Sequence, residues 1–273
     1  MDPRLQLRVQ RYGWDRAQPH YDRYWREQLA PAQRLLLQMA ALQRGERVLD
    51  VACGTGLLSF PAAGAVGPRG KVVGTDISQA MVEVCTEEAR ERGASWTYFE
   101  RMDAQSLDLP DGVFDATLCG FGLMYYPDPD RALREMRRVL RPGGRIAVAV
   151  WGARDRCGWA EIFPIVDLRV NSEVCPLFFQ LGTGDMLRVS LERAFFKQVE
   201  IERISAVLQY PTAEDAVGAA FAGGPVALAY SRFEPAIREE VHAEYLASIA
   251  GYKKGSGYAI PGEFVIGRGV RVS

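Results

Sequence analysis

The sequence has few of the features that mark secreted, membrane-embedded or metal-binding proteins. Of its 273 residues, five are cysteine and two are histidine. The number of cysteines is odd and no two of them form a CxxC pair, which argues against a disulfide framework and against a thiolate zinc site. No run of eighteen apolar residues occurs, and the N-terminus lacks an apolar signal segment. We therefore expect a cytoplasmic protein with no metal site and no membrane span.

Neither sign of charge is in excess. Lysine and arginine together number 33, and aspartate and glutamate 34, so the net charge at pH 7 is −1. Because a phosphate backbone is bound through clustered positive charge, no nucleic-acid partner is expected. The composition is otherwise that of a soluble globular protein, and the length is sufficient for a full hydrophobic core. No repeat or low-complexity linker interrupts residues 1–273, which predicts a single domain.

Beyond residue 45, short apolar runs alternate with stretches of helical periodicity. This alternation predicts parallel strands joined by helical crossovers. Ser78 is suited to cap the second helix, and the Arg-Pro-Gly-Gly sequence at 141–144 to end the third. The expected strands lie at 48–52, 71–75, 96–101, 114–119 and 145–151, and the expected helices at 57–66, 79–92 and 129–140. The predicted fold class is α/β: a Rossmann-like, open, mostly parallel seven-stranded sheet with helices on both faces and a helical cap made by insertions.

The flanking segments are expected to cover this cofactor-binding core, which we assign to residues 45–151. Residues 1–44 are predicted to form an N-terminal helical flap of two helices joined near Pro19. The segments 152–191 and 210–255 are predicted to be cap insertions, because they combine clustered aromatics or helical patterns with no strand alternation. The last strands are expected within 196–209 and 258–268, the second of them short.

The sharpest motif runs from Val48 to Gly56, where a hydrophobic strand leads into a Gly-Thr-Gly turn and then a helix. In an open α/β sheet such a turn lies at the carboxyl ends of the strands, where ligands bind. Gly54 and Gly56 allow the backbone to approach a ligand closely at a helix N-terminus. A tight turn without a ligand also favours glycine, so this motif alone leaves both interpretations open.

Asp76 ends the next predicted strand, where an aspartate can accept hydrogen bonds from ribose hydroxyls or cap the following helix. Together the two motifs favour a nucleoside ligand, either a dinucleotide or an adenosyl sulfonium. The dinucleotide fingerprint has a third Gly or Ala where this chain has Ser59. Asp50, just before the turn, would repel a pyrophosphate and attract a sulfonium and an amino group. Charge therefore favours S-adenosylmethionine over NAD.

Four motifs in this order resemble those of class I S-adenosylmethionine-dependent methyltransferases, in the ubiquinone/menaquinone-biosynthesis-like (methyltransferase type 11) group. They are the run at 48–56, Val-Gly-Thr-Asp at 73–76, Met-Asp-Ala at 102–104 with Phe-Asp-Ala-Thr-Leu-Cys at 114–119, and Leu-Arg-Pro-Gly-Gly-Arg at 140–145. The resemblance is strong over residues 8–151 and weak beyond them. It implies an enzyme that uses S-adenosylmethionine and releases S-adenosylhomocysteine.

The resemblance also places the cofactor on these motifs and on the flap. Asp76 would bind the ribose, Ile77 and Met81 would cover one face of adenine, and Asp103 would accept from the adenine amino group. Ile77 and Met81 also fit an ordinary core. The expected set is Tyr21, Asp50, Ala52, Gly54, Thr55, Gly56, Asp76, Ile77, Met81, Met102, Asp103, Ala104, Cys119 and Gly120.

Methyl transfer from a sulfonium requires alignment and exclusion of water rather than a covalent nucleophile, so Cys119 is expected to act as a small apolar residue. A general base is needed only if the acceptor loses a weakly acidic proton. His20, in the flap, is the candidate base, with a surface or packing role as the alternative. The other histidine, His242, is a weaker one.

The acceptor is expected to be a small, planar aromatic or quinone/natural-product-like molecule, because the flap and cap are rich in aromatic residues. Its predicted binding residues are Tyr24, Phe121, Met124, Tyr125, Trp151 and Phe179, with Trp159, Phe163, Phe178, Phe221 and Tyr230 as further lining. A nicotinamide-dependent oxidoreductase and a non-catalytic methyltransferase-like binding protein remain as alternatives. The sequence leaves open the acceptor, the methylated atom, and whether the chain is a monomer or homodimer.

Overall fold

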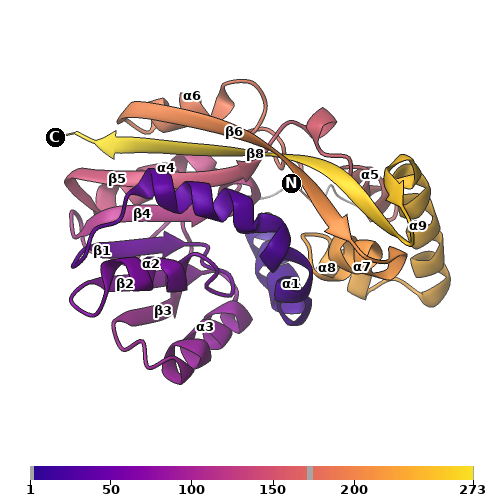
Figure 1. The fold of residues 1–273 in the computed structure, drawn as a ribbon, viewed down its shortest axis with the longest axis horizontal. Coiled ribbons are helices and arrows are strands. Elements are labelled where there is room, and N and C mark those ends of the chain that lie inside the picture. Colours follow the sequence, from indigo (N-terminus) through magenta and orange to yellow (C-terminus); the bar gives the residue numbers. More distant parts are fainter. Residues whose placement is uncertain (1–2, 171–174, 273) are drawn as a thin grey trace.

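The computed structural model describes residues 3–170 and 175–272, and a single mixed sheet runs through this part of the chain (Figure 1). The strand order is β3-β2-β1-β4-β5-β8-β6, with a two-residue strand, β7, paired to β8. The first five strands are parallel, whereas β8 is antiparallel to β5 and to β6. The strands are β1 (Arg47–Val51), β2 (Lys71–Asp76), β3 (Thr97–Arg101), β4 (Phe114–Gly120), β5 (Leu140–Trp151), β6 (Phe196–Tyr210), β7 (Lys253–Lys254) and β8 (Gly257–Arg271). The predicted fold class is confirmed.

Helices connect the parallel strands as the sequence pattern predicts. The Ser78 hydroxyl accepts a hydrogen bond from the Met81 N–H at the start of α3, and the Asp128 carboxylate caps α4 at Arg131 N–H. In the view of Figure 1, α1 and α2 lie in front of the sheet and α4 behind it. The helices are α1 (Pro3–Ala40), α2 (Ser59–Val66), α3 (Gln79–Glu91), α4 (Pro129–Val139), α5 (Ile162–Asp167), α6 (Met186–Arg193), α7 (Ala213–Val217), α8 (Ala227–Ser231) and α9 (Pro235–Ser248).

The prediction of two N-terminal helices joined near Pro19 is wrong, because α1 is one helix of 38 residues with Pro19 and Pro31 inside it. A proline inside a helix removes one backbone hydrogen bond and costs about 3 kcal/mol, with a bend as the usual result. Figure 1 shows α1 bending along its length. The helix continues because its apolar side, including Trp25, Leu29 and Leu36, is buried against the sheet and the cap.

The prediction of a short last strand is also wrong. β8 has 15 residues and pairs with β6 from Phe196↔Arg271 to Tyr210↔Tyr258. Glycines at 257, 262, 267 and 269 interrupt its hydrophobic pattern and hide its length in the sequence. Figure 1 shows β6 and β8 continuing past β5 to the helices α7 and α9. The two long strands therefore carry the cap as an extension of the sheet.

The two segments predicted to form the cap contain helices of two kinds. α5 lies against α9, where Arg169 forms an ion pair with Glu244. α6, in contrast, packs on β6 and β8 and covers the sheet. Residues 1–2, 171–174 and 273 lie outside the described part of the chain. Within that part, no helix combines the length and the apolarity needed to cross a membrane.

Candidate active site

A cavity opens at the carboxyl ends of β1, β2 and β4, beneath α1. It encloses about 960 Å³ outside protein atoms, its opening to solvent included. The residues that follow β1 (Ala52, Gly54), end β2 (Thr75, Asp76) and end β4 (Gly120) form one wall. Ligand sites of open α/β sheets lie at this edge because all parallel strands point their carboxyl ends toward it.

The two glycines of the turn after β1 have different roles. Gly54 has a positive φ of 54°, lines the cavity and donates its N–H to Asp76 Oδ2 at 2.9 Å. Gly56 also has a positive φ, but it faces Phe60 and Cys85, and a Cβ placed on it would lie 2.5 Å from the Phe60 ring. Gly56 therefore serves packing beneath the turn and does not line the cavity.

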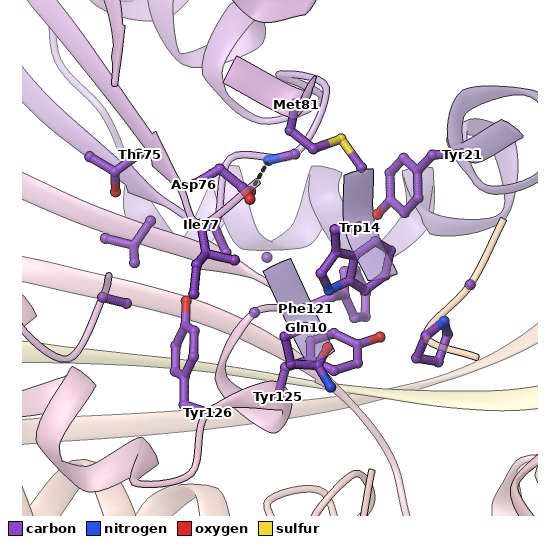
Figure 2. Close-up of a pocket in the computed structure, with 18 of the residues that line it drawn as sticks. Gln10, Trp14, Tyr21, Thr75, Asp76, Ile77, Met81, Phe121, Tyr125 and Tyr126 are labelled. Carbon is purple, nitrogen blue, oxygen red and sulfur yellow. Dashed lines mark hydrogen bonds between the residues drawn. The ribbon is translucent and has the colours of Figure 1, made fainter. Parts of the chain in front are cut away.

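Asp76 is the carboxylate at the centre of the wall formed by β2. Its Oδ1 accepts from the Ser78 N–H at 2.9 Å, so backbone donors hold both oxygens and fix the direction of the side chain. Burial raises the pKa of Asp76 to about 6, and the hydrogen bonds from Ser78 and Gly54 oppose that rise. Figure 2 shows Asp76 beside Ile77 and Met81, with Trp14 and Tyr21 of α1 on the other side of the cavity.

Asp50 lies behind this wall rather than in it. Its side chain is fully buried, its Oδ2 accepts from Ser59 Oγ at 2.6 Å, and it does not line the cavity. Its Oδ1 has no hydrogen-bond partner among the described residues. Burial raises the pKa of Asp50 to about 7, although the Ser59 hydrogen bond lowers it. Asp50 therefore lies outside the cavity lining, and its expected contact with the cofactor stays a prediction.

Two carboxylates of α1 attach this helix to the start of α3 and to the glycine turn after β1. Asp15 Oδ1 accepts from Ser78 Oγ at 2.6 Å and from the Ala80 N–H at 3.3 Å, at the start of α3. Asp22 Oδ1 accepts from Thr55 Oγ1 at 2.5 Å, in the glycine turn. Our sequence analysis missed both residues, although their seven-residue spacing places them on one face of a helix.

We expect Thr55→Val to weaken binding of S-adenosylhomocysteine about fivefold to tenfold. The variant keeps the shape of the side chain and removes the hydrogen bond to Asp22, which is worth about 1–1.5 kcal/mol. The matched control is Thr86→Val, which removes a hydroxyl that donates to Val82 O on α3, away from the flap. Isothermal titration calorimetry on both variants tests this, and equal affinities for the two would contradict it.

Backbone strain is concentrated where β1 and β4 meet the cavity. Ala52 and Phe121 both line the cavity and both have a positive φ, 56° and 64°. Between them lies Gly122, where a Cβ would approach that of Ala52 to 2.5 Å. A positive φ costs a residue with a side chain about 1–2 kcal/mol, and such strain persists where the surrounding structure holds it, often at functional sites.

The remainder of the cavity is lined by a continuous belt of aromatic rings. Starting at α1, successive ring centroids lie 5.8 Å (Trp14–Tyr21), 5.1 Å (Trp14–Tyr125), 5.5 Å (Tyr125–Phe178), 5.5 Å (Phe178–Trp159), 4.8 Å (Trp159–Trp151) and 5.8 Å (Trp151–Phe121) apart. The belt thus runs from Tyr21 of α1 to Phe121 after β4, and both of these residues line the cavity. The site therefore has a polar half and an aromatic half within one cavity.

Most residues predicted for the cofactor line this cavity, as do three of those predicted for the acceptor. The first group is Tyr21, Ala52, Gly54, Asp76, Ile77, Met81, Met102, Asp103, Ala104 and Gly120, and the second is Phe121, Tyr125 and Trp151. Trp159 and Phe178 from the further lining are also present. The structure brings these residues together although those predicted for the acceptor and its further lining are spread between positions 121 and 178.

The remaining predicted residues do not line the cavity. Asp50, Thr55, Gly56, Tyr24, Met124 and Phe179 make the packing or hydrogen-bond contacts of its supporting layer, and so do Phe163, Phe221 and Tyr230. Cys119 is fully buried, and burial raises the pKa of its thiol to about 12, as suits an apolar role. His20 is exposed on α1 and His242 is bonded to Tyr230, so neither faces an acceptor in this cavity.

Further lining residues escaped the sequence analysis. α1 supplies five of the eleven, because the one-helix geometry carries its N-terminal part over the cavity. Aromatic and apolar residues at helical spacing in α1 were the available signal. The missed residues are Leu7, Gln10, Trp14, Trp25, Leu29, Val51, Thr75, Gly122, Tyr126, Gly224 and Pro225.

Comparison with known proteins agrees with this geometry. Residues 23–154 match the ubiE/COQ5 methyltransferase family. This part of the chain is similar to the ubiE/COQ5 methyltransferases. It is 41% identical over 116 residues to a 2-phytyl-1,4-naphtoquinone methyltransferase of Synechococcus elongatus, covering 42% of this chain and 50% of the relative. A demethylmenaquinone methyltransferase of Listeria welshimeri is 38% identical over 127 residues, covering 46% and 54%. The chain thus spans about half the length of the curated relatives it matches.

Solved structures extend the likeness to the whole fold. The YcgJ protein of Bacillus subtilis has a TM-score of 0.61 at 20% identity, covering 89% of this chain and 99% of that one. The [4+2]-cyclase SpnF has a TM-score of 0.56 at 26% identity, covering 89% and 81%. Both proteins therefore share the fold of this chain over 89% of its length.

Proposed function

We propose that the protein is an S-adenosylmethionine-dependent methyltransferase. The observation that carries this proposal is the wall built by Gly54, Asp76, Ile77 and Met81, in which a backbone-held carboxylate lies beside the apolar side chains of Ile77 and Met81. Relationship to the ubiE/COQ5 methyltransferases supports the same cofactor. S-adenosylmethionine, when bound, supplies a methyl group on a positively charged sulfur and leaves as S-adenosylhomocysteine.

The residues of the polar half would bind and orient this cofactor. Asp76 would accept hydrogen bonds from the ribose hydroxyls with the lone pairs that Gly54 and Ser78 leave free. Asp103, held at the cavity wall by the Gln105 N–H at 2.9 Å, would accept from the adenine amino group. α1, attached through Asp15 and Asp22, would close the site and exclude water.

The aromatic half would hold a planar acceptor such as a naphthoquinone in its reduced form. Rings of Trp14, Tyr125, Phe178, Trp159 and Trp151 surround this space, and flat rings pack well against aromatic side chains. Two related proteins named for naphtoquinone and menaquinone substrates support this choice of acceptor. The cavity offers no cation among its described lining residues, which suits an acceptor without a strong negative charge.

The chain contributes little base chemistry to the cavity. No histidine is among the described lining residues, and burial raises the pKa of Tyr125 and Tyr126 well above the ordinary value, so both phenols stay protonated at neutral pH. The methyl group would bond to an electron pair of the acceptor, which would then release its own proton. An electron-rich quinol carbon or oxygen fits this requirement because its proton leaves without a strong base.

A second candidate activity is cyclisation. The chain is similar in structure to the [4+2]-cyclase SpnF over 89% of its length at 26% identity, and a largely aromatic cavity without histidine among its described lining residues also suits such a reaction. On either activity the protein would act in the cytoplasm, as a monomer or homodimer and without nucleic acid. Its net charge of −1 agrees with the expectation that nucleic acid is not a partner.

Calorimetry and a product assay test the proposal together. We expect S-adenosylhomocysteine to bind with micromolar affinity and NADPH not to bind. With S-adenosylmethionine and 1,4-naphthohydroquinone, mass spectrometry should show a methylated ring. Absence of S-adenosylhomocysteine binding would refute the cofactor assignment. Binding without methylation of any quinol would favour the cyclase or the non-catalytic interpretation.

A further inference from the structure

Trp159 carries a hydrogen-bond donor that the described protein leaves without an acceptor. The side chain is 5% exposed and lines the aromatic half of the cavity, between Cys157 and α5. Its indole Nε1 is buried and has no hydrogen-bond partner among the described residues. Trp25 lines the same cavity, yet its Nε1 donates to Gly223 O at 2.9 Å. The Nε1–H of Trp25 is therefore already used in a hydrogen bond, whereas the Nε1–H of Trp159 remains available to an oxygen of a ligand.

An unpartnered buried donor is costly, so its presence calls for a reason. Leaving such a group without an acceptor costs about 1–3 kcal/mol, and most buried donors in proteins are paired. Packing does not require the indole nitrogen here, since the neighbours of Trp159 are Trp25, Trp151, Phe163, Phe178 and Phe179, with ring centroids 4.8–6.4 Å away. A phenylalanine would make the same kind of contact without the cost.

The same aromatic neighbours prevent the indole from turning to find an acceptor in the protein. Five rings surround it, and rings offer the N–H no carbonyl or hydroxyl oxygen. The described residues thus leave Nε1 without an acceptor, and a molecule bound in the cavity that Trp159 lines can supply one.

We propose that Trp159 determines acceptor specificity by donating a hydrogen bond from Nε1 to a carbonyl or hydroxyl oxygen on a planar ring. This inference rests on the proposed function and narrows its acceptor to ring systems that carry oxygen. A single fixed donor recognises one oxygen and so orients the ring within the belt. It also rejects a hydrocarbon of the same shape, because the donor would then stay unpaired beneath it.

A pair of probes of similar shape tests this in the full-length protein loaded with S-adenosylhomocysteine. 1,4-Naphthoquinone has two oxygens where 1,4-dimethylnaphthalene has two methyl groups. Equilibrium dialysis gives the ratio of their dissociation constants for the wild type, Trp159→Phe and Trp25→Phe. We expect Trp159→Phe to shift this ratio about tenfold toward the hydrocarbon, as the loss of one hydrogen bond requires. Trp25→Phe should leave the ratio unchanged, because its indole is already paired.

A stability measurement on the same variants separates the two tryptophans further. Trp159→Phe removes an N–H donor that has no acceptor among the described residues, so only the loss of packing contacts lowers the stability of this variant. Trp25→Phe removes the partner of Gly223 O and leaves a buried carbonyl unpaired. We expect Trp25→Phe to lower the urea midpoint more than Trp159→Phe does. The opposite order would contradict the unpaired state of Trp159.

Nuclear magnetic resonance detects binding of the probe in the wild-type protein itself. A variant is needed only to assign the peak that responds. The chain has five tryptophans, and ¹⁵N labelling gives each indole N–H a cross-peak. Addition of 1,4-naphthoquinone should shift one indole proton downfield, and that peak should be the one missing from Trp159→Phe. Dimethylnaphthalene should not produce this shift.

The outcomes distinguish failure of this inference from failure of the proposed function. If the wild type does not bind S-adenosylhomocysteine, the methyltransferase proposal is wrong. If it binds S-adenosylhomocysteine but Trp159→Phe and Trp25→Phe change the probe ratio equally, Trp159 serves packing alone. The same conclusion follows if no indole proton responds to the quinone.

Discussion

Replacing Asp76 with alanine is expected to weaken S-adenosylhomocysteine binding by about 100-fold or more. The change removes the acceptor for two ribose hydroxyls, and hydrogen bonds to a charged group are worth about 1.5–3 kcal/mol each. It also frees the N–H groups of Gly54 and Ser78, which Asp76 holds at 2.9 Å, and so loosens the wall of the cavity. Isothermal titration calorimetry measures the loss directly.

Asp76→Asn and Asp108→Ala serve as comparisons. Asp76→Asn keeps one oxygen acceptor and loses the charge, so we expect an intermediate affinity. Asp108 is exposed and its replacement should leave binding at the wild-type value. Thermal unfolding of all three variants reports whether each is folded. A folded Asp76→Ala protein with wild-type affinity would show that Asp76 only caps α3, the alternative that the sequence left open.

Asp50→Asn is expected to remove a large pH dependence from the stability of the protein without ligand. Burial raises the pKa of Asp50 to about 7, above the ordinary value of 3.8. Between these two values the folded state holds a proton that the unfolded state has released, so stability falls as pH rises. The slope is about 1.4 kcal/mol per pH unit, which gives a loss of about 2–3 kcal/mol from pH 5 to pH 7. The contribution of Asp50 to stability is fully present below its ordinary pKa of 3.8, which applies to the unfolded state.

Urea denaturation at pH 5, 6, 7 and 8 measures this effect. Asp76, whose pKa is raised to about 6, contributes a similar trend in wild type and variant, so the difference between the two curves isolates Asp50. Asp108→Asn is the matched control and should follow the wild-type curve. Parallel curves for wild type and Asp50→Asn would mean that Asp50 is charged in the folded protein at all of these pH values.

The order of motifs in the sequence was sufficient to predict the fold and most residues that line the polar half of the cavity. Gly54 follows β1 and Asp76 ends β2, and adjacent parallel strands bring their carboxyl ends together whatever the rest of the chain does. Ile77, Met81 and Asp103 are tied to the same strand ends by a few residues of chain. Local sequence therefore decides this part of the site.

Residues that depend on packing were harder to predict. Gly56 and Asp50 lie within the same motif as Gly54 but do not line the cavity. Gly56 packs against Phe60, and the Asp50 carboxylate accepts a hydrogen bond from Ser59. His20 and Tyr21 are neighbours on α1, and only the tyrosine faces the ligand space. A helix turns by 100° per residue, so a motif locates a segment without determining which of its side chains points inward.

By itself the sequence determined an α/β chain and predicted a nucleoside site at one edge of its sheet, because strand, glycine turn and carboxylate are local features and the parallel sheet brings its strand ends together. The tertiary structure alone decided that α1 is one bent helix attached through Asp15 and Asp22, and that the Nε1 of Trp159 is left unpaired in an aromatic belt. Both depend on contacts between segments far apart in the chain, and the free energy of such contacts is set by packing rather than by local propensity.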